Sequence, residues 1–110
     1  MPSIEILPDG SRRVTLTRPL VSHAGEVRAI TLREPSYADF MTLDDPTAYV
    51  LANGSALPQD DMATIRAYVE RCADVDAPTL DRIKVLADAM ALAEAVKGFF
   101  KAASDGVSKT

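Results

Sequence analysis

The sequence has few of the residues on which catalysis or metal binding depends. Its 110 residues contain one histidine, one cysteine and no tryptophan, and none of the five glycines belongs to a phosphate-binding loop or a nucleophile motif. His23 stands in an expected turn without acidic or cysteine partners at metal-ligand spacing, which predicts a solvated loop residue. Cys72 excludes an internal disulfide, indicates a reducing compartment and falls on a helical stripe, where a small core residue is expected. We therefore expect no enzyme activity, no cofactor and no metal.

Long apolar runs and an excess of positive charge are also lacking. No run of about 18 apolar residues is present, and residues 1–10 lack the basic start and apolar stretch of a signal peptide. The net charge of −4 argues against nucleic-acid binding. Five arginines and two glutamates lie between Arg12 and Glu34, whereas eight acids and two arginines lie between Asp39 and Asp76. We expect a cytoplasmic protein without membrane or nucleic-acid partners, whose two charged ends help to orient a docking protein.

The remaining composition is typical of one small globular domain. Apolar residues make up 47% and charged residues 25% of the chain, but aromatic residues only 5%. Alanine supplies much of the apolar content, which predicts a thin core, closely spaced helices and a capacity to form a homo-oligomer. The sequence predicts an α+β fold, with one domain over residues 12–103, a loose arm or short edge strand over 1–11, and a frayed tail over 104–110.

The first part of the domain has the alternation of a β-hairpin. Val14 and Leu16 alternate with threonines, and the segment from Val27 to Arg33 returns, so residues 12–33 are predicted to form an antiparallel pair. Pro35 then ends the strand. Ser36 can cap a short helix to Leu43, with Asp39 at the third position after it, and with Tyr37, Phe40 and Met41 spaced three and four apart.

The segment of residues 46–60 has two interpretations. Asn53-Gly54 between short apolar runs favours a second hairpin with a type I′ turn. Alternatively, Pro46 to Ala52 forms a helical turn that ends at Gly54. We favour the hairpin, and its role stays open.

Residues 60–103 carry helical patterns that predict about three helices. Asp60 or Asp61 can cap a helix whose apolar stripe contains Met62, Ile65, Tyr68 or Val69, and Cys72. Residues 79–103 carry two apolar faces on nearly opposite sides, Leu80, Ile83, Leu86 and Met90 on one, and Val85, Leu92, Val96 and Phe99 on the other. Either a partner covers one face, or the helix breaks near Ala87-Asp88 with Asp88 as cap. We favour the break.

Other polar and aromatic features have ordinary structural interpretations. The acid pairs Asp44-Asp45 and Asp60-Asp61 are typical of caps and turns, and Arg12-Arg13 of a charged, protected strand edge. Phe99 and Phe100 are adjacent and cannot point the same way on a helix, so one can pack inward while the other is partly exposed and anchors a partner. The alternative is that both close the core of the small domain, and we favour this alternative.

The order of these features resembles the tail assembly chaperone family of tailed phages and prophages, the E-type proteins of contractile-tailed phages. In that family a β-hairpin leads into an LR-x-P-x-x-x-D segment, represented here by Leu32, Arg33, Pro35 and Asp39. The C-terminal pattern, an aspartate followed by l-x-x-x-v-x-x-F-F, is represented by Asp88, Leu92, Val96, Phe99 and Phe100. IRAYVERCA before Pro78 is similar to the penultimate helix, whereas YVLANGSAL is an insertion that shorter members lack. The resemblance spans roughly residues 12–100.

The resemblance implies a non-catalytic chaperone that coats the helical, aggregation-prone tape measure protein before the tail tube polymerises, and that is absent from the finished virion. Leu92, Val96, Phe99 and Phe100 would contact the client. A longer frameshifted form of the chain is a second implied partner, because codons for Gly98-Phe99-Phe100 can form a slippery run. The rival interpretations are a small acidic regulatory or antitoxin-like adaptor for one folded partner, and a minor structural tail protein.

Overall fold

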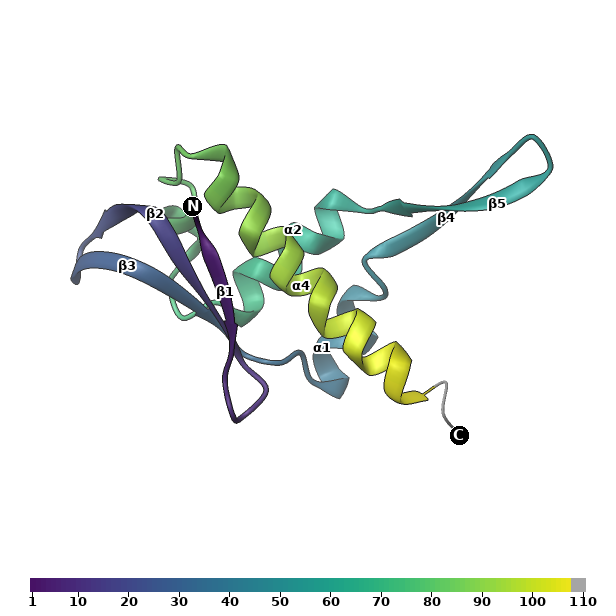
Figure 1. Cartoon of the computed structure of the whole chain (residues 1–110), viewed down its shortest axis with the longest axis horizontal. Coiled ribbons are helices and arrows are strands. Elements are labelled where there is room, and N and C mark those ends of the chain that lie inside the picture. Colours follow the sequence, from purple (N-terminus) through teal and green to yellow (C-terminus); the bar gives the residue numbers. More distant parts are fainter. Residues whose placement is uncertain (108–110) are drawn as a thin grey trace.

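The computed structural model describes residues 1–107 and has a mixed α+β fold. Three antiparallel strands in the order β1-β2-β3 form the N-terminal sheet: β1 (Ser3–Ile6), β2 (Arg12–Ser22) and β3 (Gly25–Leu32). The predicted hairpin of β2 and β3 is therefore confirmed. Residues 3–6 pair with β2 (Figure 1). Of the two alternatives for the N-terminal segment, the short edge strand is therefore confirmed and the flexible arm is wrong. His23 lies exposed in the turn between β2 and β3, as expected.

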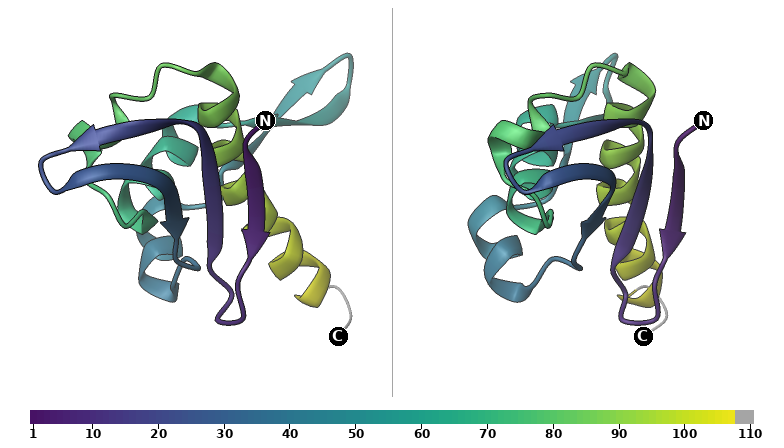
Figure 2. Two further views of the ribbon diagram at one scale, coloured as in Figure 1. Left: turned by 60° about the vertical axis from the view of Figure 1, so that its left-hand side comes forward. Right: turned by 90° about the vertical axis from the view of Figure 1, so that its left-hand side faces the viewer.

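A register shift in β2 bends the sheet. Arg12–Thr15 pair with Leu32–Ala29, the pairing is interrupted between Thr15 and Leu20, and Leu20–Ser22 then pair with Val27–Gly25. Figure 2 shows the resulting curvature of the long hairpin. Within the interruption the Thr17 and Arg18 amides donate hydrogen bonds to the Asp88 carboxylate, at 2.9 and 3.3 Å. A carboxylate from another element thus satisfies amides that the ladder leaves free.

Ser36 and Asp39 form the expected capping box at the start of helix α1 (Tyr37–Leu43). The chain then forms a second antiparallel pair, β4 (Thr47–Ala52) and β5 (Ser55–Asp60), around Asn53 and Gly54 with φ angles of 53° and 81°. These positive angles are those that a type I′ turn requires, so the hairpin interpretation of residues 46–60 is confirmed and the helical turn is wrong. The hairpin projects away from the rest of the molecule (Figure 1).

Three helices follow, as predicted: α2 (Met62–Cys72), α3 (Ala77–Leu80) and α4 (Leu86–Val107). Asp61, rather than Asp60, caps α2. The break in the last segment is confirmed but lies at residues 81–85, before the predicted position at Ala87-Asp88. Asp88 is not the cap of the second piece, because its carboxylate is directed to β2. The predicted fraying from residue 104 is wrong up to Val107, and residues 108–110 of the predicted tail lie outside the described residues.

The core lies between one face of the N-terminal sheet and helices α2 and α4 (Figure 2). Its most buried side chains come from all three of these layers: Val14, Ile30, Leu32, Ile65, Tyr68, Ala95 and Val96. The break in the helical segment accounts for only part of the second apolar face, since Leu80 and Ile83 precede α4 and pack against the core. The Leu92 face is buried, whereas Leu86 and Met90 remain 74% and 58% exposed. Met62 is also exposed, so the predicted stripe of α2 begins at Ile65.

Candidate functional site

Most of the residues predicted to bind a partner lie in the core. Leu92, Val96 and Phe99 are 4%, 1% and 5% exposed and pack against the sheet and α2. All three close the domain's own interior, so Leu92 and Val96 are not accessible to another protein, which corrects the predicted binding set, and Phe99 offers only the small exposed part of its ring. Phe100 is partly buried and lines a groove. The favoured interpretation, that both phenylalanines close the core, therefore holds for Phe99 and only in part for Phe100, which packs against the core but stays partly exposed.

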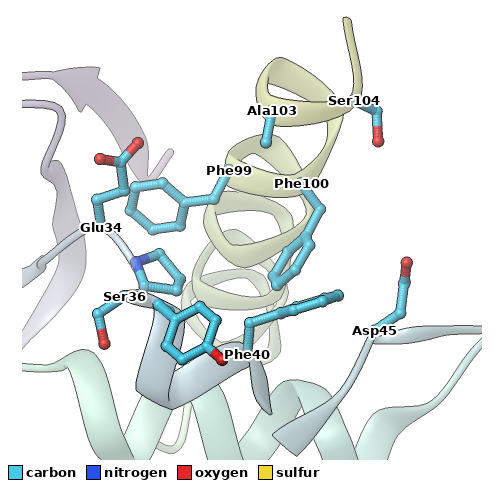
Figure 3. Close-up of a pocket in the computed structure, with 10 residues that line it drawn as sticks. Glu34, Ser36, Phe40, Asp45, Phe99, Phe100, Ala103 and Ser104 are labelled. Atoms are coloured by element: carbon cyan, nitrogen blue, oxygen red, sulfur yellow. The ribbon is translucent and has the colours of Figure 1, made fainter. Parts of the chain in front are cut away.

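The groove lies between α1, with the residues that precede it, and the C-terminal half of α4. It has a volume of about 510 Å³ and is open to solvent. Figure 3 shows Phe99 and Phe100 directed from α4 towards the facing segment, with Phe100 close to Phe40. The walls are mainly apolar, with polar groups at the margins; the lining residues are Glu34, Pro35, Ser36, Tyr37, Phe40, Asp45, Phe99, Phe100, Ala103 and Ser104.

Aromatic contacts fix the floor of the groove. The ring of Phe100 lies edge-on to that of Tyr68 at a centroid distance of 5.0 Å and 6.1 Å from that of Phe40. The Tyr68 hydroxyl donates a hydrogen bond of 2.6 Å to the Asp44 carbonyl oxygen, and burial raises the pKa of this hydroxyl. Phe99 lies beneath the guanidinium of Arg12, 4.9 Å from the ring centroid. These contacts hold Phe99 and Phe100, the aromatic side chains of α4 that line the groove.

The outer wall of the groove exposes large apolar side chains. Tyr37 is 79% exposed and Phe40 39%, and Met41 beside them on α1 is 62% exposed. Their spacing correctly predicted a helix. A seven-residue helix, however, reaches too little of the core to bury three large side chains, so the length of the predicted helix was a signal for surface residues.

A buried carboxylate holds α1 in place. Asp39, 2% exposed, accepts hydrogen bonds from Arg33 at 2.6 Å, from Arg71 at 2.6 Å and from the Ser36 amide at 2.8 Å. The hydrogen bond from Arg33 is the largest cause that holds the pKa of Asp39 far below its usual value, followed by that from the Ser36 backbone. Because Arg71 belongs to α2, this cluster ties α1 to both the end of β3 and α2.

Asp88 has a comparable role at the other end of the molecule. The carboxylate is 1% exposed, and this burial alone would raise its pKa. The hydrogen bonds from Thr17 and Arg18 outweigh burial, so the pKa lies below its usual value. Among the motif residues, Leu32 is fully buried, Arg33, Asp39 and Asp88 form internal contacts, and Pro35 lines the groove.

Residues 1–107 offer no cluster of three or more His, Cys, Asp or Glu side chains that could hold a metal ion. Within the same residues, no helix is long and apolar enough to cross a membrane. Comparison of the chain with protein-family models, with curated proteins and with solved structures finds no match.

Proposed function

We propose that this protein is a non-catalytic tail assembly chaperone of a phage or prophage, which binds the tape measure protein and keeps it soluble before the tail tube polymerises. The order of motifs described above suggests the family. The observation that carries the proposal is the open aromatic groove between α1 and α4, which leaves Tyr37 and Phe40 in contact with solvent. Exposed apolar patches bordered by polar residues are typical of protein-binding sites.

The groove suits a helical client with an apolar stripe. Its volume of about 510 Å³ is that of a pocket that takes a few side chains, not a whole helix. One copy would therefore cover a short part of the stripe, with side chains at helical spacing inserted against Phe40 and Phe100. A long client would need several copies. The net charge of −4 would then keep the coated client soluble.

The test is co-expression with the tape measure protein encoded nearby, with measurement of soluble client and of client that co-purifies. Ala103→Trp fills the groove from its α4 wall at an exposed position, so it leaves the core intact. We expect this variant to lose the client. Met90→Glu is the matched control, since Met90 is an exposed apolar residue of the same helix outside the groove. It should retain the client.

Two outcomes would contradict the proposal. If wild-type protein leaves the client insoluble, or if Ala103→Trp solubilises it as well as Met90→Glu does, the groove does not bind this client. Isolation of a stable one-to-one complex with a folded protein, lost in Ala103→Trp, would instead identify the protein as an adaptor. Presence of the chain in purified virions would identify it as a structural tail protein.

A further inference from the structure

The β4–β5 hairpin leaves large apolar side chains in solvent. Tyr49 is 72% exposed, Leu51 85% and Leu57 48%, and every residue of β5 is exposed. At its base, Lys97 of α4 contacts the Asp60 carboxylate at 3.1 Å, and the two strands then run outwards (Figure 1). A two-stranded hairpin without further strands or a covering helix is marginally stable in water, so a further strand paired with this hairpin would stabilise it.

The alternation of hydrogen-bonded and non-hydrogen-bonded pairs in the hairpin shows which backbone groups point outwards. The Asp61 amide donates to the Pro46 carbonyl oxygen at 2.8 Å, so this pair is of the hydrogen-bonded kind. Hydrogen-bonded and non-hydrogen-bonded pairs alternate along an antiparallel ladder. The pairs Thr47/Asp60, Tyr49/Pro58 and Leu51/Ala56 are therefore non-hydrogen-bonded, and their backbone groups point to the outer edges.

The two outer edges of the hairpin differ. On β5, Pro58 occupies the central outward position and has no amide hydrogen, so it blocks pairing there. On β4, the Thr47 amide donates to Asp45 at 2.8 Å. Tyr49 and Leu51 present both amide and carbonyl outwards, away from β5, because their pairs with Pro58 and Ala56 are non-hydrogen-bonded. The outer edge of β4 is thus open.

The edges of the N-terminal sheet are protected, in contrast to that of β4. Strand β1 carries Glu5 and is flanked by Pro2 and Pro8. The edge of β3 is covered near Thr31, whose carbonyl accepts from the Asp74 amide at 3.1 Å and whose amide donates to the Asp74 carboxylate at 3.1 Å. Charges, prolines and covering segments are the devices by which proteins prevent pairing between edges. Strand β4, of sequence TAYVLA, contains no charge or proline, and Pro46, which precedes it, lies outside the outward positions of Tyr49 and Leu51.

We propose that β4 pairs antiparallel with β4 of a second copy of this chain, giving a four-stranded sheet in the order β5-β4-β4-β5 about a two-fold axis. A strand without charges can face its own copy without opposing like charges, even though the protein as a whole carries a net charge of −4. The two-fold arrangement makes the contact self-complementary and closed, because Pro58 stops growth at both outer strands. This inference does not depend on the proposed function.

Side-chain placement supports the same partner. Tyr49 and Leu51 lie on one face of the hairpin together with Ala56 and Pro58, since side chains alternate along a strand and directly opposed residues share a face. Pairing of two copies about an axis at Val50 brings Tyr49 of one copy opposite Leu51 of the other. The most exposed apolar side chains of the hairpin then cover each other, as cross-strand aromatic and aliphatic pairs do.

The first test is sedimentation velocity of the full chain, from about 1 µM to about 1 mM, on three proteins. We expect wild type to form dimers. Leu51→Pro removes an outward amide from β4 without breaking a β4–β5 hydrogen bond and should raise the dimer dissociation constant at least about tenfold. Ala56→Pro, the matched control, makes the same change at the directly opposed outward position of β5 and should leave dimerisation unchanged.

Amide hydrogen exchange of the wild type provides a second measurement that does not rely on a variant. The Tyr49 and Leu51 amides should become protected as protein concentration rises, whereas the outward Ala56 amide should exchange fast throughout. A wild-type protein that stays monomeric over this range would overturn the proposal. So would dimers that form equally well in Leu51→Pro, or concentration-dependent protection at Ala56 in place of Tyr49 and Leu51.

Discussion

Replacement of Asp39 by alanine should strongly destabilise the fold, and the size of the effect follows from the contacts of one side chain. The carboxylate is 3% exposed and serves as the capping-box acceptor for the Ser36 amide, a contribution of about 1 kcal/mol. It also pairs with Arg33 and Arg71, which are 49% and 42% exposed. Because both arginines stay hydrated when Asp39 is removed, each pair contributes about 1 kcal/mol, less than a fully buried pair. The free energy of unfolding should therefore fall by about 3 kcal/mol.

The effect should depend on pH in one direction. The pKa of Asp39 is lowered in the folded state, so its contribution is fully present above the pKa of an aspartate in the unfolded chain, about 3.9. The contribution is lost progressively as the pH falls below that value, because proton binding then favours the unfolded chain. The difference between wild type and Asp39→Ala should therefore be largest near neutral pH and should shrink below about pH 4.

Urea unfolding followed by circular dichroism, at neutral pH and at about pH 3, measures both quantities. Asp81→Ala is the control, since Asp81 forms an ion pair with Arg66 at 3.5 Å but is 65% exposed, and its loss should change stability by less than about 0.5 kcal/mol. An Asp39→Ala effect as small as that of the control, or one of equal size at both pH values, would refute the role assigned to this carboxylate.

Three further variants test other contacts of the fold. Asp88→Ala leaves the Thr17 and Arg18 amides without their acceptor, so the free energy of unfolding measured in urea should fall by about 2–3 kcal/mol. A fall of less than about 0.5 kcal/mol, which is typical of a surface substitution, would contradict this role. Tyr68→Phe removes the hydrogen bond to the Asp44 carbonyl and should lower stability by about 1 kcal/mol in the same assay, while the near-ultraviolet spectrum keeps its aromatic packing signal. Gly54→Val places a β-branched residue at a φ of 81°, which such a residue strongly disfavours. Amide exchange in β4 and β5 should therefore accelerate while exchange in α2 stays unchanged. Equal acceleration in the hairpin and in α2 would show that the hairpin does not unfold as an independent unit.

Local chemistry made much of the architecture predictable. Alternating valine, leucine and threonine residues predicted β2 and β3, the Ser36 and Asp39 pair predicted the start of α1, and Asn53-Gly54 predicted the second hairpin. Each of these signals acts within a few residues, where steric preference and local hydrogen bonds decide the conformation. The two apolar faces of the last segment correctly predicted a break, but Leu86 and Met90 lie after it on α4 and stay exposed, so the break does not bury their face.

Long-range contacts explain what the sequence did not reveal. Asp88 has the residue type of a helix cap, but its hydrogen bonds go to amides of β2 about 70 positions away, and no local pattern encodes that pairing. Leu92, Val96 and Phe99 form an apolar stripe along α4 that can pack against a partner protein or against the domain's own core. Only the position of the sheet shows that they pack in the core. The groove depends on α1 and α4, which are distant in sequence, so its walls could not be joined by spacing arguments.

Asp39 and Asp88, the two buried aspartates of the sequence motifs, hold the helices from which the groove is built, although neither side chain lines the groove. Asp39 fixes the helix that carries Tyr37 and Phe40 against Arg71 of α2, and Asp88 fixes the first turn of α4 on β2. Asp39 thus positions the α1 wall, whereas the buried side chains of Val96 and Phe99 hold the half of α4 that forms the other wall. Phe100 spans the gap between the walls through its contacts with Phe40 and Tyr68. If the groove binds the client, a change at Asp39 should weaken that binding by releasing a wall while every groove side chain remains present. Binding by a preformed groove depends on this positioning as much as on the apolar residues themselves.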